Sequence, residues 1–594
     1  MKRQSATAPM QGTLNRRSFL GLLGAGIAVV GVPSLLSSCS TAGAGVNAAT
    51  AGKVSAGVLP GYFPVEYISP DFPSVNGSTA GYASIPKELV KAFPKPPGSG
   101  GTYTAMTPLW GTIPPTKGNQ YFDAVNEASG TTLAFQISDG NTYGDKLAAV
   151  LASAKDVPDW VSIPSWNVPP RFGQAVDALF EDLTPFLAGD AVKKYPNLAN
   201  ISTDTWKFCV FNDKLYALPF PGEIITDATF YRADVFDELG ITAQPTNAQE
   251  LLDLAKEVTD PAAKRWGAND LWVTATQMYS VPPKWKVDDA GKLVHRVETD
   301  EYRAALEWQS KLYAQGSVHP DAVADNSGDA KQRFESGQVL ISSDGLGGWH
   351  EALGRNLPIN AAYSQLPFAP FAADGGKATL FKGNPANIFS FLKKNSDKAK
   401  IEELLTVANF LASPFGTEEF ALINYGVEGV HYDLDENNLP VSTDRAATEL
   451  QPTFIFLTDP PVVNAKVQYP GFVEAFCTWM ADAAKTTVDP VFYGQQITEP
   501  NQYASIAQPF EDLEKDIARG RKSMTDLDAA ITTWKSAGGD ELRTQAFDVE
   551  FVAFFEEESM RGQILGRRQS RQCSAGGDHE QVALAAHHGI ERGQ

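Results

Sequence analysis

Residues 215–249, LYALPFPGEIITDATFYRADVFDELGITAQPTNAQ, decide how this chain divides. An apolar strand is expected at residues 215–218, followed by a break at Pro219, Pro221 and Gly222, and by a second strand at residues 229–231. Helices are expected only after the second strand. This order favours a chain that leaves one α/β lobe for another through a hinge, although the same residues also fit a strand–loop–strand within one domain.

Two helices are predicted to follow the second strand. The first covers residues 233–239 and ends at Gly240, because glycine adopts the left-handed conformation without steric cost. Thr246 and Gln249 have the spacing of a capping box, which predicts the start of the second helix. Its apolar face is formed by Leu251, Leu252, Leu254, Ala255 and Val258.

Length and charge limit the class of protein. A chain of 594 residues exceeds what one hydrophobic core usually serves, so at least two lobes are expected. The formal net charge of −21 argues against nucleic acid as a partner, because phosphates require a basic face.

The four cysteines include no CxxC pair, which argues against a metal cluster or a disulfide framework. Cys209 and Cys477 have apolar neighbours, and they fit either two buried thiols or one bridge.

The N-terminal region has the features of an export signal. Arg16 and Arg17 precede an apolar run at residues 19–36, as in a twin-arginine signal, and LSSC at residues 36–39 resembles a lipoprotein lipobox. We therefore expect residues 1–38 to be a twin-arginine-type lipoprotein signal peptide. Residues 39–61 would be a flexible tether that begins at a lipidated (palmitate-bearing) Cys39, and residues 62–101 form a Pro/Gly-rich arm.

The first lobe is predicted from a β-α-β-α-β pattern that begins at residue 102. Its strands end near Leu109, Ile137 and Ile163, with amphipathic helices between them, so a parallel sheet with right-handed crossovers is expected. Ligands collect beyond the carboxyl ends of such strands. These ends are residues 110–112, 138–141 and 164–167.

The second lobe is expected to begin near Thr226 and to contain a long helix from Asp300 and a strand at residues 339–341. After Leu366 the chain returns to the first lobe through a strand at residues 388–392. The predicted division is residues 102–225 plus 366–426 for the first lobe, 226–365 plus 427–545 for the second, and an atypical, disordered tail at 546–594.

Several short motifs resemble those of the extracellular solute-binding lipoproteins that serve ABC sugar and oligosaccharide importers. They are LYALP (215–219), YRAD (231–234), NYGVEG (424–429) with His431-Tyr432, and Trp534 with GGD (538–540), within a resemblance that spans residues 58–545. The resemblance implies a two-lobed, type II periplasmic-binding-protein-like fold in the α/β class, with a mixed sheet and flanking helices in each lobe and a hinge between them. It also implies a monomer without enzymatic activity, anchored on the outer face of the cell membrane, that closes on a carbohydrate and docks to a permease.

Sugars are bound by aromatic faces and by planar polar side chains. Trp110 and Trp166 at strand ends of the first lobe, and Trp349 at a strand end of the second, are the candidates for stacking, with core packing as the alternative for each. The polar candidates lie at predicted strand ends or glycine turns and are Asn141, Asn167, Glu223, Asp344, Asn384 and Glu428. For any one of them, a solvated loop or a capping role is the alternative.

Other chemistry has weaker support. His350 occupies the third glycine position of a dinucleotide fingerprint, which therefore fails, and no cofactor is expected. Asp433, Asp435 and Asn437 have a spacing that could hold calcium, with a plain hairpin turn as the alternative. The sequence thus favours a carbohydrate-binding lipoprotein, with a secreted glycosidase-like enzyme or a transport-independent sugar sensor as the rival functions.

Overall fold

The computed structural model describes residues 57–544, except for residues 170–171, 243, 327–328, 437, 496–501 and 504–505. The predicted signal peptide, Cys39 and the tail at 546–594 lie outside the described residues. No helix in the described part of the chain is long and apolar enough to cross a membrane.

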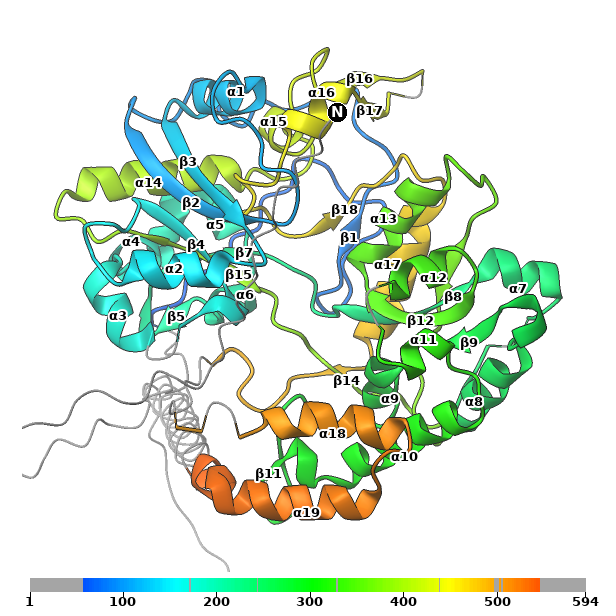
Figure 1. The fold of residues 1–594 in the computed structure, drawn as a ribbon. Helices are drawn as coiled ribbons and strands as arrows, with labels where there is room; N and C mark the ends of the chain where they lie inside the picture. The colour runs from blue at the N-terminus through cyan, green and yellow to red at the C-terminus, as the bar shows by residue number, and fades with distance from the viewer. Residues whose placement is uncertain are drawn as a thin grey trace, which may run out of the picture. The chain divides into compact units, whose positions relative to one another are not determined.

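A five-stranded sheet, called here the first sheet, organises the first lobe (Figure 1). Its strand order is β3 (Thr132–Asp139), β2 (Thr102–Leu109), β4 (Trp160–Pro164), β15 (Ile388–Leu392) and β7 (Ala217–Phe220). β2 runs parallel to β3 and β4, as the β-α-β-α-β pattern predicts, whereas β15 runs antiparallel to β4 and β7. The sheet is therefore mixed, and the predicted return of the chain at residues 388–392 is confirmed.

A separate four-stranded sheet, the second sheet, organises the second lobe. Its order is β13 (Gln365–Pro367), β8 (Asp227–Arg232), β12 (Val339–Gly345) and β9 (Trp266–Ala268). β8 is antiparallel to both of its neighbours, and β12 is parallel to β9.

The hinge prediction is confirmed by the placement of β7 and β8 in different sheets. Residues 221–226 therefore pass from one sheet to the other. The chain crosses back between β13 and β15, and this second crossing is hydrogen-bonded to the first. Gly222 N–H donates to the Pro385 carbonyl at 2.9 Å, and Gly383 N–H donates to the Ile224 carbonyl at 2.8 Å. The two strands therefore do not lie together in one sheet.

The helices around the hinge follow the predicted pattern with one correction. α7 (Ala233–Leu239) ends at Gly240, which has a φ of 68°. The cap of α8 (Ala248–Glu257) is Asn247, whose side chain accepts from Glu250 N–H, while the Glu250 carboxylate accepts from Thr246 N–H at 2.8 Å. The predicted pair of Thr246 and Gln249 is thus wrong by one residue: Asn247 caps the helix, and Glu250, one position after Gln249, accepts from Thr246 N–H.

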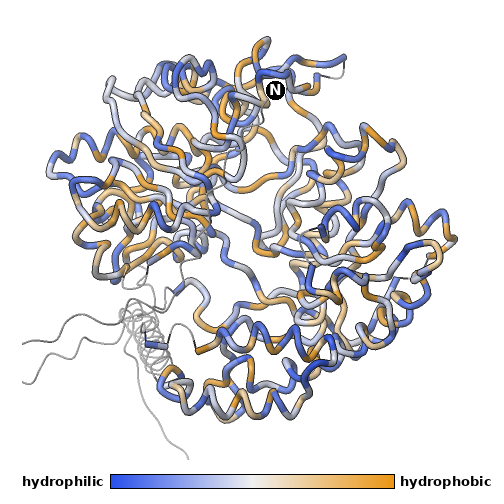
Figure 2. Tube along the Cα trace, viewed as in Figure 1, coloured by the Kyte–Doolittle hydropathy of each residue, from blue (hydrophilic) through white to orange (hydrophobic). Residues whose placement is uncertain are grey.

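The remaining helices cover the two sheets. Those packed on or beside the first sheet are α1 (Gln120–Ser129), α2 (Tyr143–Leu151), α3 (Phe172–Leu179), α4 (Thr184–Leu187), α5 (Pro196–Ala199), α6 (Thr203–Lys207), α14 (Lys398–Leu411), α15 (Glu418–Tyr425) and α16 (Asp444–Glu449). Those whose buried residues pack in the cores of the second lobe are α9 (Trp272–Met278), α10 (Asp300–Ala314), α11 (Pro320–Val323), α12 (Ala330–Glu335), α13 (Gly347–Asn356), α17 (Phe472–Ala484), α18 (Gln508–Ala518) and α19 (Met524–Trp534). Figure 2 shows hydrophobic residues gathered along the strands of the first sheet, which agrees with the complete burial of Trp160, Val161 and Phe391.

The boundaries predicted at residues 366 and 427 are both displaced in the structure. β13 pairs with β8 in the second sheet and Phe368 packs in a core of the second lobe, so the chain returns to the first lobe later than residue 366. Phe454 and Leu457 are buried in the core of the first sheet, and the Thr458 hydroxyl donates to the Pro219 carbonyl at 2.9 Å. Phe472 and Phe476 of α17 pack instead with the second sheet. The chain therefore leaves the first lobe after Leu457, and the NYGVEG motif and the residues after it belong with the first sheet.

The Pro/Gly-rich arm contacts both lobes. Phe63 packs on the first core, and its N–H donates to the Ala199 carbonyl at 2.8 Å. Further along, Phe72 packs against the core of the second sheet, and β1 (Ala80–Gly81) pairs in parallel with β18 (Val463–Asn464).

The two described cysteines are not bridged. Cys209 is buried in the core of the first sheet, whereas Cys477 of α17 is buried in that of the second. Both side chains are free thiols, so the sequence alternative of two buried thiols holds.

Candidate functional site

Three strands of the first sheet end at the same edge. β4 lies parallel to β2, and β7 has the same direction as β4 because both are antiparallel to β15. Trp110 follows β2, the 3-10 turn Ser165–Asn167 follows β4, and Phe220 ends β7. This is the carboxyl edge at which ligands of α/β sheets collect.

Four aromatic side chains meet at this edge, and we call them the aromatic platform: Trp110, Trp166, Phe220 and Phe456. The Trp110 and Trp166 rings have centroids 5.9 Å apart and an interplanar angle of 50°. Phe456 meets Trp110 edge-on at 5.8 Å, and it lies 5.9 Å from Phe220. The two tryptophans predicted to stack on a ligand are therefore brought together.

The exposure of the two tryptophans is what makes the platform a candidate binding surface. Trp110 is 42% exposed and Trp166 is 61% exposed, although the chain buries Trp160, Trp206 and Trp308 almost completely. Indole faces attract the electron-poor C–H groups of a sugar ring, and leaving them in water forgoes about 1.5–3 kcal/mol of burial per large side chain. A ligand that covers the exposed parts of these faces would recover the corresponding part of that free energy.

Two polar candidates adjoin the platform. Asn141 lies exposed in the turn after β3, where its N–H donates to the Asp139 carboxylate at 2.9 Å. Asn167 follows Trp166 directly, and its Oδ1 atom is buried without a hydrogen-bond partner among the described residues. Both residues are thus neighbours in sequence of residues that form or contact the platform, and their part in binding stays a prediction.

Glu223 and Asn384 lie on the crossings between the sheets. Burial raises the pKa of Glu223, which lines a cavity of about 930 Å³ together with parts of the arm and with Pro385. Asn384 Oδ1 accepts from Ala386 N–H at 2.8 Å. Neither tryptophan of the platform lines that cavity, so the cavity does not bring Glu223 together with the stacking pair.

The edge of the second sheet is different. Asp344 lies in β12, where it accepts from Gly345 N–H at 2.8 Å and where burial raises its pKa. Trp349 is 2% exposed in α13, with its ring 5.6 Å from Phe230 and 5.1 Å from Phe472. Trp349 is therefore a core residue and not a stacking surface. A helix begins at Gly347, and its first turn directs the indole inward.

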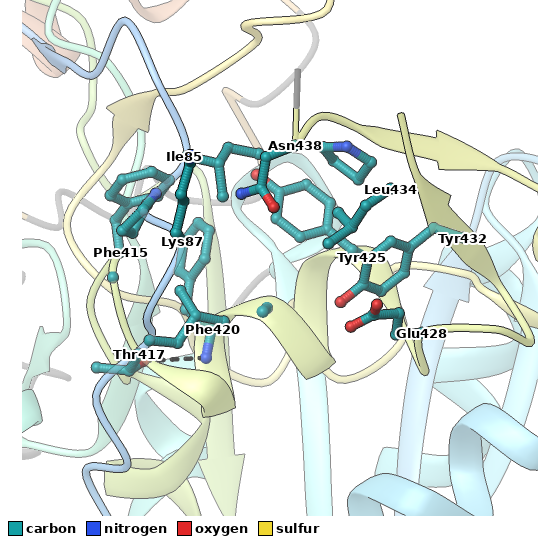
Figure 3. A pocket seen from close by; sticks show the side chains of 15 residues that line it. Ile85, Lys87, Phe415, Thr417, Phe420, Tyr425, Glu428, Tyr432, Leu434 and Asn438 are labelled. Atoms are coloured by element: carbon teal, nitrogen blue, oxygen red, sulfur yellow. Dashed lines mark hydrogen bonds between the residues drawn. The ribbon is translucent and has the colours of Figure 1, made fainter. Parts of the chain in front are cut away.

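The NYGVEG motif forms a turn at the end of α15. Glu428 is exposed and lines a small pocket of about 90 Å³ with Tyr432 and Phe420, separate from the platform. Figure 3 shows the Glu428 carboxylate and the Tyr432 hydroxyl directed toward each other. Burial, and then the Glu428 charge, raise the pKa of Tyr432.

His431 explains part of this motif in structural terms. It is completely buried, its Nδ1 accepts from Val427 N–H at 3.0 Å, and its Nε2 lies 3.4 Å from Glu449 Oε2. A histidine that accepts at Nδ1 carries its proton at Nε2, so it donates to the carboxylate. His431 thereby ties the turn to α16.

The calcium prediction falls on a hairpin. β16 (Tyr432–Leu434) pairs antiparallel with β17 (Pro440–Ser442), and Asp435 Oδ1 accepts from Leu439 N–H at 2.8 Å. Asn437 lies outside the described residues, and no cluster of three metal-binding side chains occurs in the part of the chain that the structure describes. Calcium binding at this turn stays a prediction.

Sequence reasoning missed Phe456 and Asp459. Phe454 and Leu457 enter the core, which leaves Phe456 at the platform, and no local pattern distinguishes these three apolar positions. Asp459 follows Thr458, which is bonded to the end of β7. Burial raises the pKa of Asp459 well above its usual value, and its Oδ1 has no hydrogen-bond partner within the described ranges.

Comparison with known proteins agrees with this arrangement. The family model for bacterial extracellular solute-binding proteins matches residues 114–417. The chain is 23% identical over 426 residues to the polygalacturonan/rhamnogalacturonan-binding protein YtcQ of Bacillus subtilis (strain 168), which covers 68% of this chain and 79% of YtcQ. It is also 23% identical to lipoprotein LipO of the same organism, over 75% of this chain and 91% of LipO.

The fold has a counterpart among solved structures. The N-glycan transport solute-binding protein NgtS of Streptococcus pneumoniae aligns with a TM-score of 0.56 and 16% identity, covering 75% of this chain and 98% of NgtS. The predicted type II periplasmic-binding-protein fold is thereby confirmed. With two sheets joined by a hinge and a family match over half of its length, this chain belongs to the bacterial extracellular solute-binding proteins.

Proposed function

We propose that this protein is the substrate-binding lipoprotein of an ABC importer, and that it captures a carbohydrate, in oligosaccharide form, at the aromatic platform. The observation that carries the proposal is the exposed pair of Trp110 and Trp166 at the carboxyl edge of the first sheet. The names of YtcQ, a polygalacturonan/rhamnogalacturonan-binding protein, and of NgtS, an N-glycan transport solute-binding protein, support the same ligand class.

The proposed mechanism is closure without chemistry. A ligand seated on the platform would also contact the second lobe, where Asp344 lies at a strand end. Because such a ligand binds the closed state more tightly than the open state, it shifts the hinge equilibrium toward closure. The permease would then recognise the closed form.

The proposal includes a lipid anchor and action as a monomer. Cleavage before Cys39 and acylation of that cysteine would hold the protein at the outer face of the membrane after export by the twin-arginine route. LipO, by its name a lipoprotein, supports the anchor. Labelling with radioactive palmitate tests it: wild type should incorporate label and Cys39→Ser should not. Label in both proteins would contradict the anchor.

A thermal-shift screen against oligogalacturonides, alginate oligomers, N-glycan fragments and neutral oligosaccharides tests the binding function. Binding to the native state alone raises the melting temperature as ligand is added. We expect at least one saccharide to raise it, and chromatography of that mixture to show the saccharide intact. Cleavage products would favour a glycosidase, and the absence of any shift would contradict carbohydrate binding.

A further inference from the structure

The turn between β3 and α2 forms the floor under Trp110. Gly140 N–H donates to the Leu109 carbonyl at 2.9 Å, which bonds this turn to the end of β2. The indole of Trp110 lies directly against Gly140: a Cβ atom added to Gly140 would come within 2.3 Å of Cε2, 2.4 Å of Nε1 and 2.5 Å of Cδ2. Contacts this short do not occur between real side chains, so with any residue other than glycine either the ring or the turn must shift.

The requirement for glycine here is one of space. Gly140 is not among the glycines with positive φ, whereas Gly130 and Gly240 are, with φ values of 70° and 68°. An L-residue can therefore adopt the backbone conformation of Gly140 without strain. An alanine at this position would therefore act through its contact with the tryptophan and not through backbone strain.

The Trp110 ring cannot move far without changing its contacts with the other rings of the platform. Phe456 contacts Trp110 edge-on at an angle of 89°, and the Trp166 ring is the neighbour at 5.9 Å. A displaced indole would therefore change the angle between the two exposed faces that the ligand is proposed to cover.

A second glycine has a weaker form of the same role. A Cβ atom on Gly144, in α2, would lie 2.9 Å from Asn167 Nδ2 and 3.7 Å from its Cγ. One terminal amide nitrogen can turn away at lower cost than a whole indole. The segment at residues 140–144 therefore contacts both the indole of Trp110 and the amide of Asn167.

We infer that Gly140, and to a smaller extent Gly144, are positioning residues of the ligand site, because their bare backbone sets the orientation of Trp110 and the place of the Asn167 amide. The inference rests on the proposed function for its effect on binding, but the orientation of Trp110 can be tested without a ligand.

The ligand-free test is circular dichroism of Gly140→Ala. Two indoles 5.9 Å apart couple their transitions, so displacement of one changes the spectrum. The difference spectrum of Gly140→Ala should reproduce the main bands of the difference spectrum of Trp110→Ala. Gly347→Ala is the matched control, since no atom outside the chain neighbours and the backbone of its own helix lies within 4 Å of the added Cβ. A Gly140→Ala spectrum identical to that of wild type would overturn the inference.

The binding test is a double-mutant cycle, titrated with the saccharide that gives the largest shift in the screen above. Gly140→Ala should weaken binding about 5- to 30-fold in wild type, by analogy with loss of an aromatic anchor. In the Trp110→Ala background it should change binding less than about 2-fold, because the two substitutions act through one side chain. Equal losses in both backgrounds would contradict positioning. If no saccharide binds wild type, the proposed function fails, while circular dichroism still decides the role of Gly140.

Discussion

The carboxyl edges of the two sheets present their tryptophans in opposite ways. Trp110 and Trp166 at the first edge are 42% and 61% exposed, whereas Trp349 at the second is 2% exposed. At the first edge a turn follows each strand, and the rings lie on the surface. At the second edge α13 begins two residues before Trp349, and the indole packs on Phe230 and Phe472. A strand-end position thus predicts where a tryptophan lies, but the element after the strand decides which way its ring points.

The largest expected effect follows from burial at the second edge. Trp349→Ala should lower the free energy of unfolding by about 3–5 kcal/mol, because it leaves a cavity among three aromatic rings. Denaturant unfolding followed by circular dichroism measures this change. Trp166→Ala is the matched control and should cost less than about 1 kcal/mol. Equal losses for both variants would abolish the contrast between the two edges.

Ligand affinity should show the reverse order. Trp166→Ala or Trp110→Ala should each weaken saccharide binding by about 1–3 kcal/mol, since each removes an exposed stacking face from the platform. Isothermal titration of the folded variants checks the loss, with Trp349→Phe as the control that keeps a ring in the core. Undiminished affinity in both platform variants would place the ligand elsewhere.

A smaller loss is expected when only the support of Trp110 is weakened. Phe456→Leu keeps an apolar side chain but removes the edge-on contact with the indole at 5.8 Å. Aromatic pairs of this kind contribute about 0.5–1.5 kcal/mol, so the loss in affinity should lie within that range. Titration beside Phe476→Leu, a change in the second core, separates this effect from a general loss of stability. If the two variants bind equally well, Phe456 has no part in the platform.

A last prediction concerns acid sensitivity at the second edge, which is independent of ligand binding. Burial, and then the charge of Lys466, lower the pKa of His350 in α13 to about 4. The unfolded chain takes up this proton near the usual histidine pKa of about 6.5, so the native state loses stability as the pH falls from there toward 4. Below about pH 4, His350 is protonated in both states and no longer makes the stability depend on pH.

Melting temperatures of His350→Gln and wild type between pH 7 and 4 measure this contribution. The variant should lose less stability over that range than wild type does. His295, whose pKa is lowered to about 3 chiefly by burial, is present in both proteins and therefore cancels in the difference. Parallel curves would show that His350 titrates alike in the folded and unfolded chain.

Local patterns predicted most of the first lobe. The alternation of Leu133, Phe135 and Ile137 and the helical spacing of Leu147 and Val150 depend only on neighbouring residues, and the structure places β3 and α2 there. Helix capping was predicted less well, because Asn247 and Glu250 are as able to cap a helix as Thr246 and Gln249 and lie only one residue further along the chain.

Long-range packing could not be predicted in the same way. Phe456 reaches Trp110 from 346 positions further along the chain, since the residues after the NYGVEG motif pack on the first core. The displaced boundary at residue 427 has the same cause, because the buried pair of His431 and Glu449 joins that turn to α16 beside α1. The burial of Trp349 likewise depends on α17, a partner more than a hundred residues away.

Calorimetric titration of the Trp110→Ala/Trp166→Ala double variant tests the central claim most directly, with wild type and Trp349→Phe measured alongside. The saccharide is the one that gives the largest thermal shift with wild type. We predict one-to-one binding to wild type and to Trp349→Phe, and affinity at least about 100-fold weaker in the folded double variant. Binding of the double variant with the affinity of wild type would contradict the assignment of the ligand to the edge of the first sheet.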